Sequence, residues 1–252
     1  MYDIQKASLL KRFSAFLLDL ILLCILVTGF AFALSAITGY DSYRDRLEQV
    51  QKQYEQQYGM SLEISQEQYD KLTEDERKLL EDAQNAFLDD PEVSYLYGME
   101  INLILLISSV SILLSCVITE LIIPLCLKNG QTVGKKIFGI ALMRVDGVKI
   151  STLALFARAI LGKYTLETMV PLFIFLMTFL GSMGLTGTIV LLLILVLQIG
   201  MVAVTKTNSA IHDVLAATVA VDLASQMIFE SEEAKIAYKQ KIHAEQVQAK
   251  PY

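Results

Sequence analysis

Two carboxylic acids lie inside long apolar stretches of the chain, where an ionised group is costly. Asp19 is the only charged residue in the apolar run 13–38, and Glu120 is the only one in the run 101–127. Both runs exceed the roughly 20 residues that span a hydrocarbon core. At about 1.5 Å rise per helical residue, each acid would lie on the order of 10 Å from the same membrane boundary. Acids at that depth are candidates for binding an ion or a proton.

A third acid shares a spacing with Glu120. Glu120 precedes Pro124 by four residues, and Glu167 precedes Pro171 by four. Because proline has no N–H, each glutamate carbonyl loses its usual helical donor. A carboxylate with a free carbonyl oxygen suits a hard monovalent cation such as Na⁺. The alternative is that the repeated spacing arises by chance.

Asp19 also has a structural interpretation. Arg12 precedes it by seven residues, which places the two on nearly the same helix face but too far apart for a close pair. Arg12 can extend towards the membrane surface, so Asp19 needs a partner from elsewhere, such as Arg158 or a backbone donor. The sequence leaves ion handling and structural pairing open for Asp19.

The composition is typical of a protein that crosses a membrane several times. The 252 residues are 54% apolar, with mean hydropathy +0.49 and no tryptophan. All three cysteines fall in apolar runs, so we expect small buried side chains and no disulfide framework. With two histidines and no Ser/His/Asp or Cys/His arrangement, the chain is expected not to be an enzyme, to use no cofactor or structural metal, and to bind no nucleic acid.

The segments predict an all-α membrane protein with four transmembrane helices, a helical extracytoplasmic insertion and a small cytoplasmic β-hairpin. Basic residues gather before the first apolar run and between the second and third, so both termini are expected in the cytoplasm. The predicted segments are the N-terminus with the first transmembrane helix (1–38), the acidic insertion (39–98), the second transmembrane helix (99–127), a basic loop (128–165), a transmembrane hairpin (166–205) and a cytoplasmic tail (206–252).

The acidic insertion is expected to fold. Residues 39–98 hold six Lys/Arg against fifteen Asp/Glu, a net charge of -9, and their apolar residues keep helical spacing. One helix is predicted to end at Gly59, and a capping box at Thr73 starts another. That second helix presents one face, composed of Leu79, Leu80, Ala83 and Phe87. A further helix is predicted to begin at Pro91, with Asp90 as its N-cap, and to run into the second span. The acids form either a solvated helical cap or a cation-binding surface.

The basic loop is predicted to lie against the membrane surface. Residues 139–150 alternate around an Asp-Gly pair, which predicts a β-hairpin, and 154–163 predict an interfacial helix. Residues 130–136 resemble a phosphate-binding loop, but the spacer is one residue short. We therefore expect Lys135, Lys136 and Arg158 to contact anionic lipid headgroups. A surface helix is predicted for 230–248, and His212 is expected either to titrate near neutral pH or to anchor the final segment.

Three segments carry a resemblance to a known family. They are KRFSAFLLD (11–19), GQTVGKKIFGI (130–140) and IHDVLAATV (211–219). In this combination and order the chain resembles the RDD family of bacterial integral membrane proteins, named for one arginine and two aspartates. The resemblance identifies Arg12 and Asp19 as the arginine and first aspartate, and Asp213 as the second. It also implies transport, with cation/proton exchange among the activities proposed for the family.

Two functional hypotheses follow. The first is secondary transport of a small ion across the bacterial plasma membrane, with a monovalent cation and a proton binding in turn at Asp19 and Glu120, assisted by Glu167. Since four helices are few for such a pathway, a homo-oligomer is expected. The second is a non-catalytic adaptor that binds a partner through the acidic insertion.

Overall fold

The computed structural model describes residues 4–127 and 129–248, and the start of the predicted basic loop, residue 128, lies outside them. The chain is mostly helical and forms two compact units. The helix-bundle unit contains the residues up to Val27 and those from Ile112 onward, and the insertion unit is Thr28–Ser111. Each unit is described by itself.

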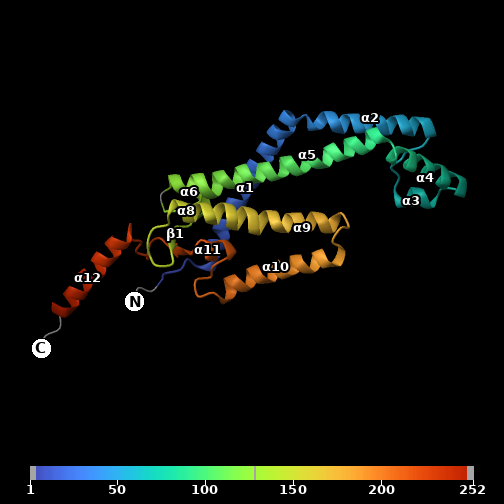
Figure 1. The fold of residues 1–252 in the computed structure, drawn as a ribbon. Coiled ribbons are helices and arrows are strands. Elements are labelled where there is room, and N and C mark those ends of the chain that lie inside the picture. The colour runs from blue at the N-terminus through green and yellow to red at the C-terminus, as the bar shows by residue number, and fades with distance from the viewer. Residues whose placement is uncertain (1–3, 128, 249–252) are drawn as a thin grey trace. The chain divides into compact units, whose positions relative to one another are not determined.

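Within the described residues, four helical stretches are long and apolar enough to cross a membrane, as the sequence predicts (Figure 1). They are α1 (Leu9–Thr38); α5 (Pro91–Cys116) continued by η1 (Val117–Ile122) and α6 (Ile123–Cys126); α8 (Thr152–Phe156) continued by η2 (Ala157–Met169) and α9 (Val170–Phe179); and α10 (Gly184–Val204). The third has a mean hydropathy of 1.4 against 2.5 to 2.7 for the others. This difference arises because it carries the charged residues of the site described below.

The third membrane helix begins earlier than predicted. The segment 154–163 was expected to be a separate interfacial helix, but it is continuous with the span that follows. Arg158 and Lys163 can lie inside this helix because each has an acidic partner within the protein. A paired charge does not need to reach the membrane surface.

The turn between the last two spans, within the predicted hairpin 166–205, covers residues 180–183. Gly187 follows it and lies within α10. A Cβ atom on Gly187 would lie 1.8 Å from Thr178 Oγ1 in α9. Glycine is therefore required here because α9 and α10 approach closely, as they do side by side in Figure 1.

A two-stranded antiparallel sheet replaces the predicted local hairpin. Strand β1 (Ile140–Arg144) pairs with the distant β2 (Thr218–Asp222), while Lys149, beyond the Asp-Gly turn, makes only an isolated bridge. Both faces of β1 are buried, one in a cluster with Ala220 and the other with Val219 and Val221. The apolar strand β2 covers the full length of β1, whereas only residues 148–150 follow the Asp-Gly turn before the N-cap of α8, too few to pair with all five residues of β1.

The helix-bundle unit also contains two short helices, α7 (Val133–Ile137) and α11 (Ile211–Leu215), and the longer α12 (Glu232–Gln248). The last corresponds to the predicted surface helix at 230–248. Helix α7 contacts β1, and α11 contacts both η2 and β2. These contacts bring the three sequence segments that carry the family resemblance into one unit.

The insertion unit contains α2 (Tyr40–Tyr58), α3 (Gln66–Asp70) and α4 (Glu74–Leu88), and its own core is formed by α2, Leu62, α4 and the first turns of α5. Gly59 ends α2 in the left-handed conformation, and Thr73 forms a capping box with Glu76, as predicted. Of the predicted α4 face, Leu80, Ala83 and Phe87 are buried, whereas Leu79 is 42% exposed. The insertion is thus a folded unit rather than a flexible loop.

The distant pairing of β1 with β2 can be tested by a disulfide. Leu142 and Ala220 lie directly opposite each other in the register, so cysteines at both positions should have the Cα separation that a disulfide needs. The expected result is rapid oxidation of Leu142→Cys/Ala220→Cys, measured as loss of maleimide-reactive thiols. The background for this test replaces the native Cys24, Cys116 and Cys126 by alanine.

The control for this test is Leu142→Cys/Val219→Cys. One residue out of register, the two side chains point to opposite faces of the sheet and should stay reduced. Equal oxidation of both variants would contradict the observed register.

Candidate functional site

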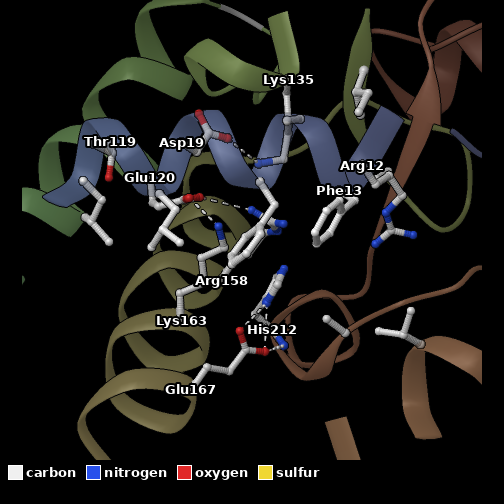
Figure 2. Close-up of a pocket in the computed structure, with 18 of the residues that line it drawn as sticks. Arg12, Phe13, Asp19, Thr119, Glu120, Lys135, Arg158, Lys163, Glu167 and His212 are labelled. Atoms are coloured by element: carbon white, nitrogen blue, oxygen red, sulfur yellow. Dashed lines mark hydrogen bonds and ion pairs between the residues drawn. The ribbon is translucent and has the colours of Figure 1, made fainter. Parts of the chain in front are cut away.

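A cavity of about 730 Å³ lies in the helix-bundle unit (Figure 2). Most of its wall is apolar, and α1 contributes Leu9, Phe13, Phe16, Leu20 and Leu23. The ionisable side chains on the wall come from α1, η1, α7, η2 and α11. They are Arg12, Asp19, Glu120, Lys135, Arg158, Lys163, Glu167 and His212. The cavity thus combines an apolar surface with a dense set of charges.

Glu120 lies among basic groups. Its Oε1 accepts a hydrogen bond from Lys163 Nζ, and its Oε2 lies 3.5 Å from Arg158 Nη1. The residue is 6% exposed, and Oε2 is buried without a hydrogen-bond donor. Lys135 is close enough for its charge to act on the same carboxylate. Glu120 is therefore the counter-ion of a cluster of cations.

Asp213 joins two arginines. Its Oδ1 lies 3.0 Å from Arg158 Nε and its Oδ2 lies 3.3 Å from Arg12 Nη2. Burial alone would raise the pKa of Asp213, but Arg158 and Arg12 hold it well below its usual value. Arg12 also donates to the carbonyl oxygens of Asn208, at 2.5 Å, and Thr207, at 3.3 Å. These bonds connect α1 and η2 to the start of α11.

Asp19 fastens α7 to α1. Its Oδ2 accepts a 2.5 Å hydrogen bond from the Thr132 hydroxyl, and its Oδ1 accepts a 2.8 Å bond from the Gly134 N–H. Lys135 Nζ is 3.9 Å away. A Cβ on Gly134 would come within 2.3 Å of the Ala15 carbonyl oxygen, so only glycine allows this approach. Of the two interpretations of Asp19, the structure shows pairing with a backbone donor.

Asp19 and Glu120 line the same cavity, but their nearest partners differ. The expected joint site for a cation would need their oxygens to converge, whereas each carboxylate is already engaged by its own donors. Within residues 4–127 and 129–248, no group of three or more His, Cys, Asp or Glu is arranged to hold a metal ion. The structure therefore brings the two acids to one cavity without bringing them together.

Glu167 pairs with His212. The imidazole Nδ1 lies 2.8 Å and 2.7 Å from the two carboxylate oxygens, and the His212 backbone N–H donates to Oε1 at 3.0 Å. Burial and the nearby charge of Arg158 lower the pKa of His212, which favours a neutral ring that donates from Nδ1. This geometry corresponds to the anchoring role rather than to a free titrating group.

Both proline sites coincide with a change in helix type. The π-helical segments η1 and η2 contain Glu120 and Glu167, and each ends just before the proline. At their ends, the Ile123 and Val170 N–H groups donate five residues back, to Ile118 and Thr165. The sequence predicted a break in the α-helical ladder at these positions, and the backbone there is wider than an α-helix.

The residues expected at lipid headgroups divide into two groups. Lys136 is exposed, but Lys135 and Arg158 are only 9% and 3% exposed and face acids within the protein. The surface role expected for these two does not describe their position, because their charges are compensated internally. Sequence reasoning also missed Lys163 and Thr132 as partners of the two acids. The available signal was that buried acids need donors from other segments. Thr132 lies in the loop after the second span, and Lys163 lies near the start of the third.

The fold and the cavity define an integral membrane protein whose helices contact the lipid bilayer and enclose a network of ion pairs. A sequence model described as the RDD family matches residues 6–217, which is most of the chain. The chain belongs to the RDD family. No curated protein and no solved structure matches it.

The buried ammonium of Lys135 predicts a pH-dependent stability. Burial lowers its pKa from 10.5 to about 8 despite the nearby acids. Between these two values the unfolded chain binds more protons than the folded one, so the free energy of unfolding should rise by about 3 kcal/mol from pH 8 to 10.5. Lys135→Met should lack this rise in a detergent melting series, whereas the exposed neighbour variant Lys136→Met should keep it. An equal pH slope in all three proteins would contradict the burial of Lys135.

The contact between η2 and α11 makes a second prediction. A Cβ on Gly162 would lie 2.5 Å from His212 Cβ, so Gly162→Ala should destabilise the protein by about 1–3 kcal/mol through overpacking. Gly200 in α10 has open space around it, and Gly200→Ala should be neutral or stabilising by up to about 1 kcal/mol. Melting midpoints in detergent compare the two variants. A stable Gly162→Ala protein would show that α11 can move away from η2 at little cost.

Proposed function

We propose that this protein transports a small ion across the bacterial plasma membrane and couples that movement to protons. The support is a cavity whose wall combines the charged groups of a membrane helix bundle with the segments of the RDD family resemblance. The proposed orientation places both termini and the basic residues of 128–165 in the cytoplasm, following the positive-inside rule.

The contact of Glu120 with Lys163 and Arg158 carries this proposal. An ionised glutamate in this position compensates the cations around it. Protonation of Glu120 would release Lys163 from its counter-ion, leave Arg158 paired with Asp213, and change the charge of the cavity by one unit. A site whose ion pairing depends on one proton can link ion binding to proton binding.

The proposal assigns roles that differ from those expected from the sequence. Asp19 holds α7 in place and is therefore assigned a positioning role in the transport site. Glu167 holds His212 and the start of α11. Glu120 is the acid whose partners are cations alone, and we assign proton coupling to it.

A homo-oligomer is part of the proposal. Four membrane helices enclose little space, and many large apolar side chains on α1, α9 and α10 are exposed in the single chain. Some of these contact lipid, and a second copy could cover others.

The transport hypothesis is tested with purified protein in liposomes that contain a pH-sensitive dye. Gradients of Na⁺, K⁺ or Li⁺, and in separate runs of an organic anion, are applied in turn, and at least one of these ions is expected to drive proton movement in the wild type. Glu120→Gln keeps the shape of the side chain but cannot exchange a proton, so the movement should fall to the level of empty liposomes.

Glu81→Gln in α4 is the matched control, because Glu81 is an exposed acid of the insertion unit. It should transport like the wild type. Proton movement that persists in Glu120→Gln would refute the role of Glu120, and a wild type that moves no protons with any ion would refute the transport function.

The second candidate function is an adaptor. The observation that favours it is that the strongly acidic insertion forms a unit with its own buried core, built around residues such as Val50, Ala83 and Val93. A folded acidic surface can present a fixed pattern of charges to a basic partner. A transport assay that is silent for the wild type would favour this function.

A further inference from the structure

The carboxylate of Glu120 occupies a place that could hold an anion from outside the protein. Lys163 donates to Oε1, and Arg158 Nη1 faces Oε2 at 3.5 Å, which is longer than a good hydrogen bond. Oε2 is buried with no hydrogen-bond donor. The basic groups of this pocket thus surround the Glu120 carboxylate but give a hydrogen bond to only one of its two oxygens.

The other acids of the cavity do not need these cations to the same extent. Asp19 receives its hydrogen bonds from a hydroxyl and a backbone N–H, and Glu167 receives its bonds from His212. Asp213 is paired with Arg12 and with the Nε of Arg158. Loss of the Glu120 charge would therefore leave Lys163 without its counter-ion and Lys135 with Asp19, 3.9 Å away.

The remainder of the wall is suited to an apolar group. The side of the cavity formed by α1 carries Phe13, Phe16 and Leu20, and Phe13 lies beside the charged cluster in Figure 2. A ligand that fills this volume would place a charged end against the lysines and a hydrocarbon part against α1. A small hydrated cation would match neither surface.

We propose that the cavity binds an amphiphilic anion, a carboxylate or phosphate attached to an apolar chain, and that Glu120 is a built-in competitor for its place. The anion contacts Lys163 and Arg158 when Glu120 takes up one proton and withdraws. This inference rests on the proposed transport function, because it names the class of ion that the site would carry.

Proton uptake follows from the groups that surround Glu120. They are Lys163 and Arg158 of η2, Lys135 of α7 and Cys116 in the preceding helical turn, while Asp19, Glu167 and His212 line the same cavity. If Glu120 takes up a proton and the anionic ligand takes its place, the number of negative charges beside the cations stays the same. Ligand affinity should then fall with rising pH, by up to about tenfold per pH unit for one proton.

Binding of decanesulfonate to the full chain in a nonionic maltoside detergent tests the proposal. Sulfonates stay charged at every pH used, so any proton taken up on binding belongs to the protein. Isothermal titrations in two buffers with different ionisation enthalpies measure that uptake, and about one proton is expected. Decyltrimethylammonium is the matched cationic probe, and methanesulfonate is the anion without the chain. Both should bind at least about tenfold more weakly, which separates an amphiphile from a free anion.

Glu120→Gln provides the decisive comparison. Removal of the competing charge should tighten decanesulfonate binding at pH 8 by about tenfold or more and abolish proton uptake, while Glu81→Gln should behave as the wild type. Stronger binding of decyltrimethylammonium, equal binding of methanesulfonate, or binding to the wild type without proton uptake would each overturn the proposal. The wild-type measurement decides the outcome even if Glu120→Gln fails to fold. Anion binding in a protein that moves no protons in liposomes would refute transport while leaving this binding site in place.

Discussion

The buried carboxylate of Asp213 is shared by Arg12 and Arg158, and the organisation of the helix-bundle unit depends on this ion pair. It joins the beginning of the first membrane helix, the charged part of the third and the short helix α11. Loss of one partner from a buried pair typically costs about 3–5 kcal/mol, because the other charge stays buried without compensation. Because Asp213 compensates the charge of Arg158, a membrane helix can contain this arginine within the bundle.

The positions of the other charged residues of the cavity follow from this ion pair. With Arg158 Nε committed to Asp213, its Nη1 is directed at Glu120, and Lys163 approaches the same carboxylate from one turn further along η2. Helix α11 contacts η2 closely at Gly162, which places His212 against Glu167. The cavity is therefore a product of structural ion pairs, and any function of Glu120 operates within a framework that those pairs keep rigid.

Much of the fold could be predicted from local patterns. Hydropathy alone predicts four membrane helices, and the caps at Gly59 and Thr73 have the expected geometry because caps depend on residues adjacent in sequence. The partner of β1 could not be predicted in this way. It depends on β2, more than seventy residues later, and on the burial of both faces of the sheet.

The candidate site was predicted in the same partial manner. The similar depth of Asp19 and Glu120 in their apolar runs predicted that they lie near one another, and both line one cavity. Depth does not predict which way a side chain points around its helix or which loops fold back onto it. The hydroxyl of Thr132 and the N–H of Gly134 reach Asp19 from such a loop, and the ammonium of Lys163 reaches Glu120 from another helix. These partners come from tertiary structure that no single segment encodes.

The π-helical segments have a consequence for how this site could have arisen and how it could be lost. A wider turn holds more residues than an α-helical turn, so side chains that share a face of η2 are spaced differently along the sequence from those of an α-helix. Removal of one residue between Lys163 and Glu167 would shorten this spacing and turn the two side chains relative to each other. The cluster around Glu120 and the contact with His212 would then face different directions, so the length of this segment, and not only its composition, determines whether the two halves of the site belong to one cavity.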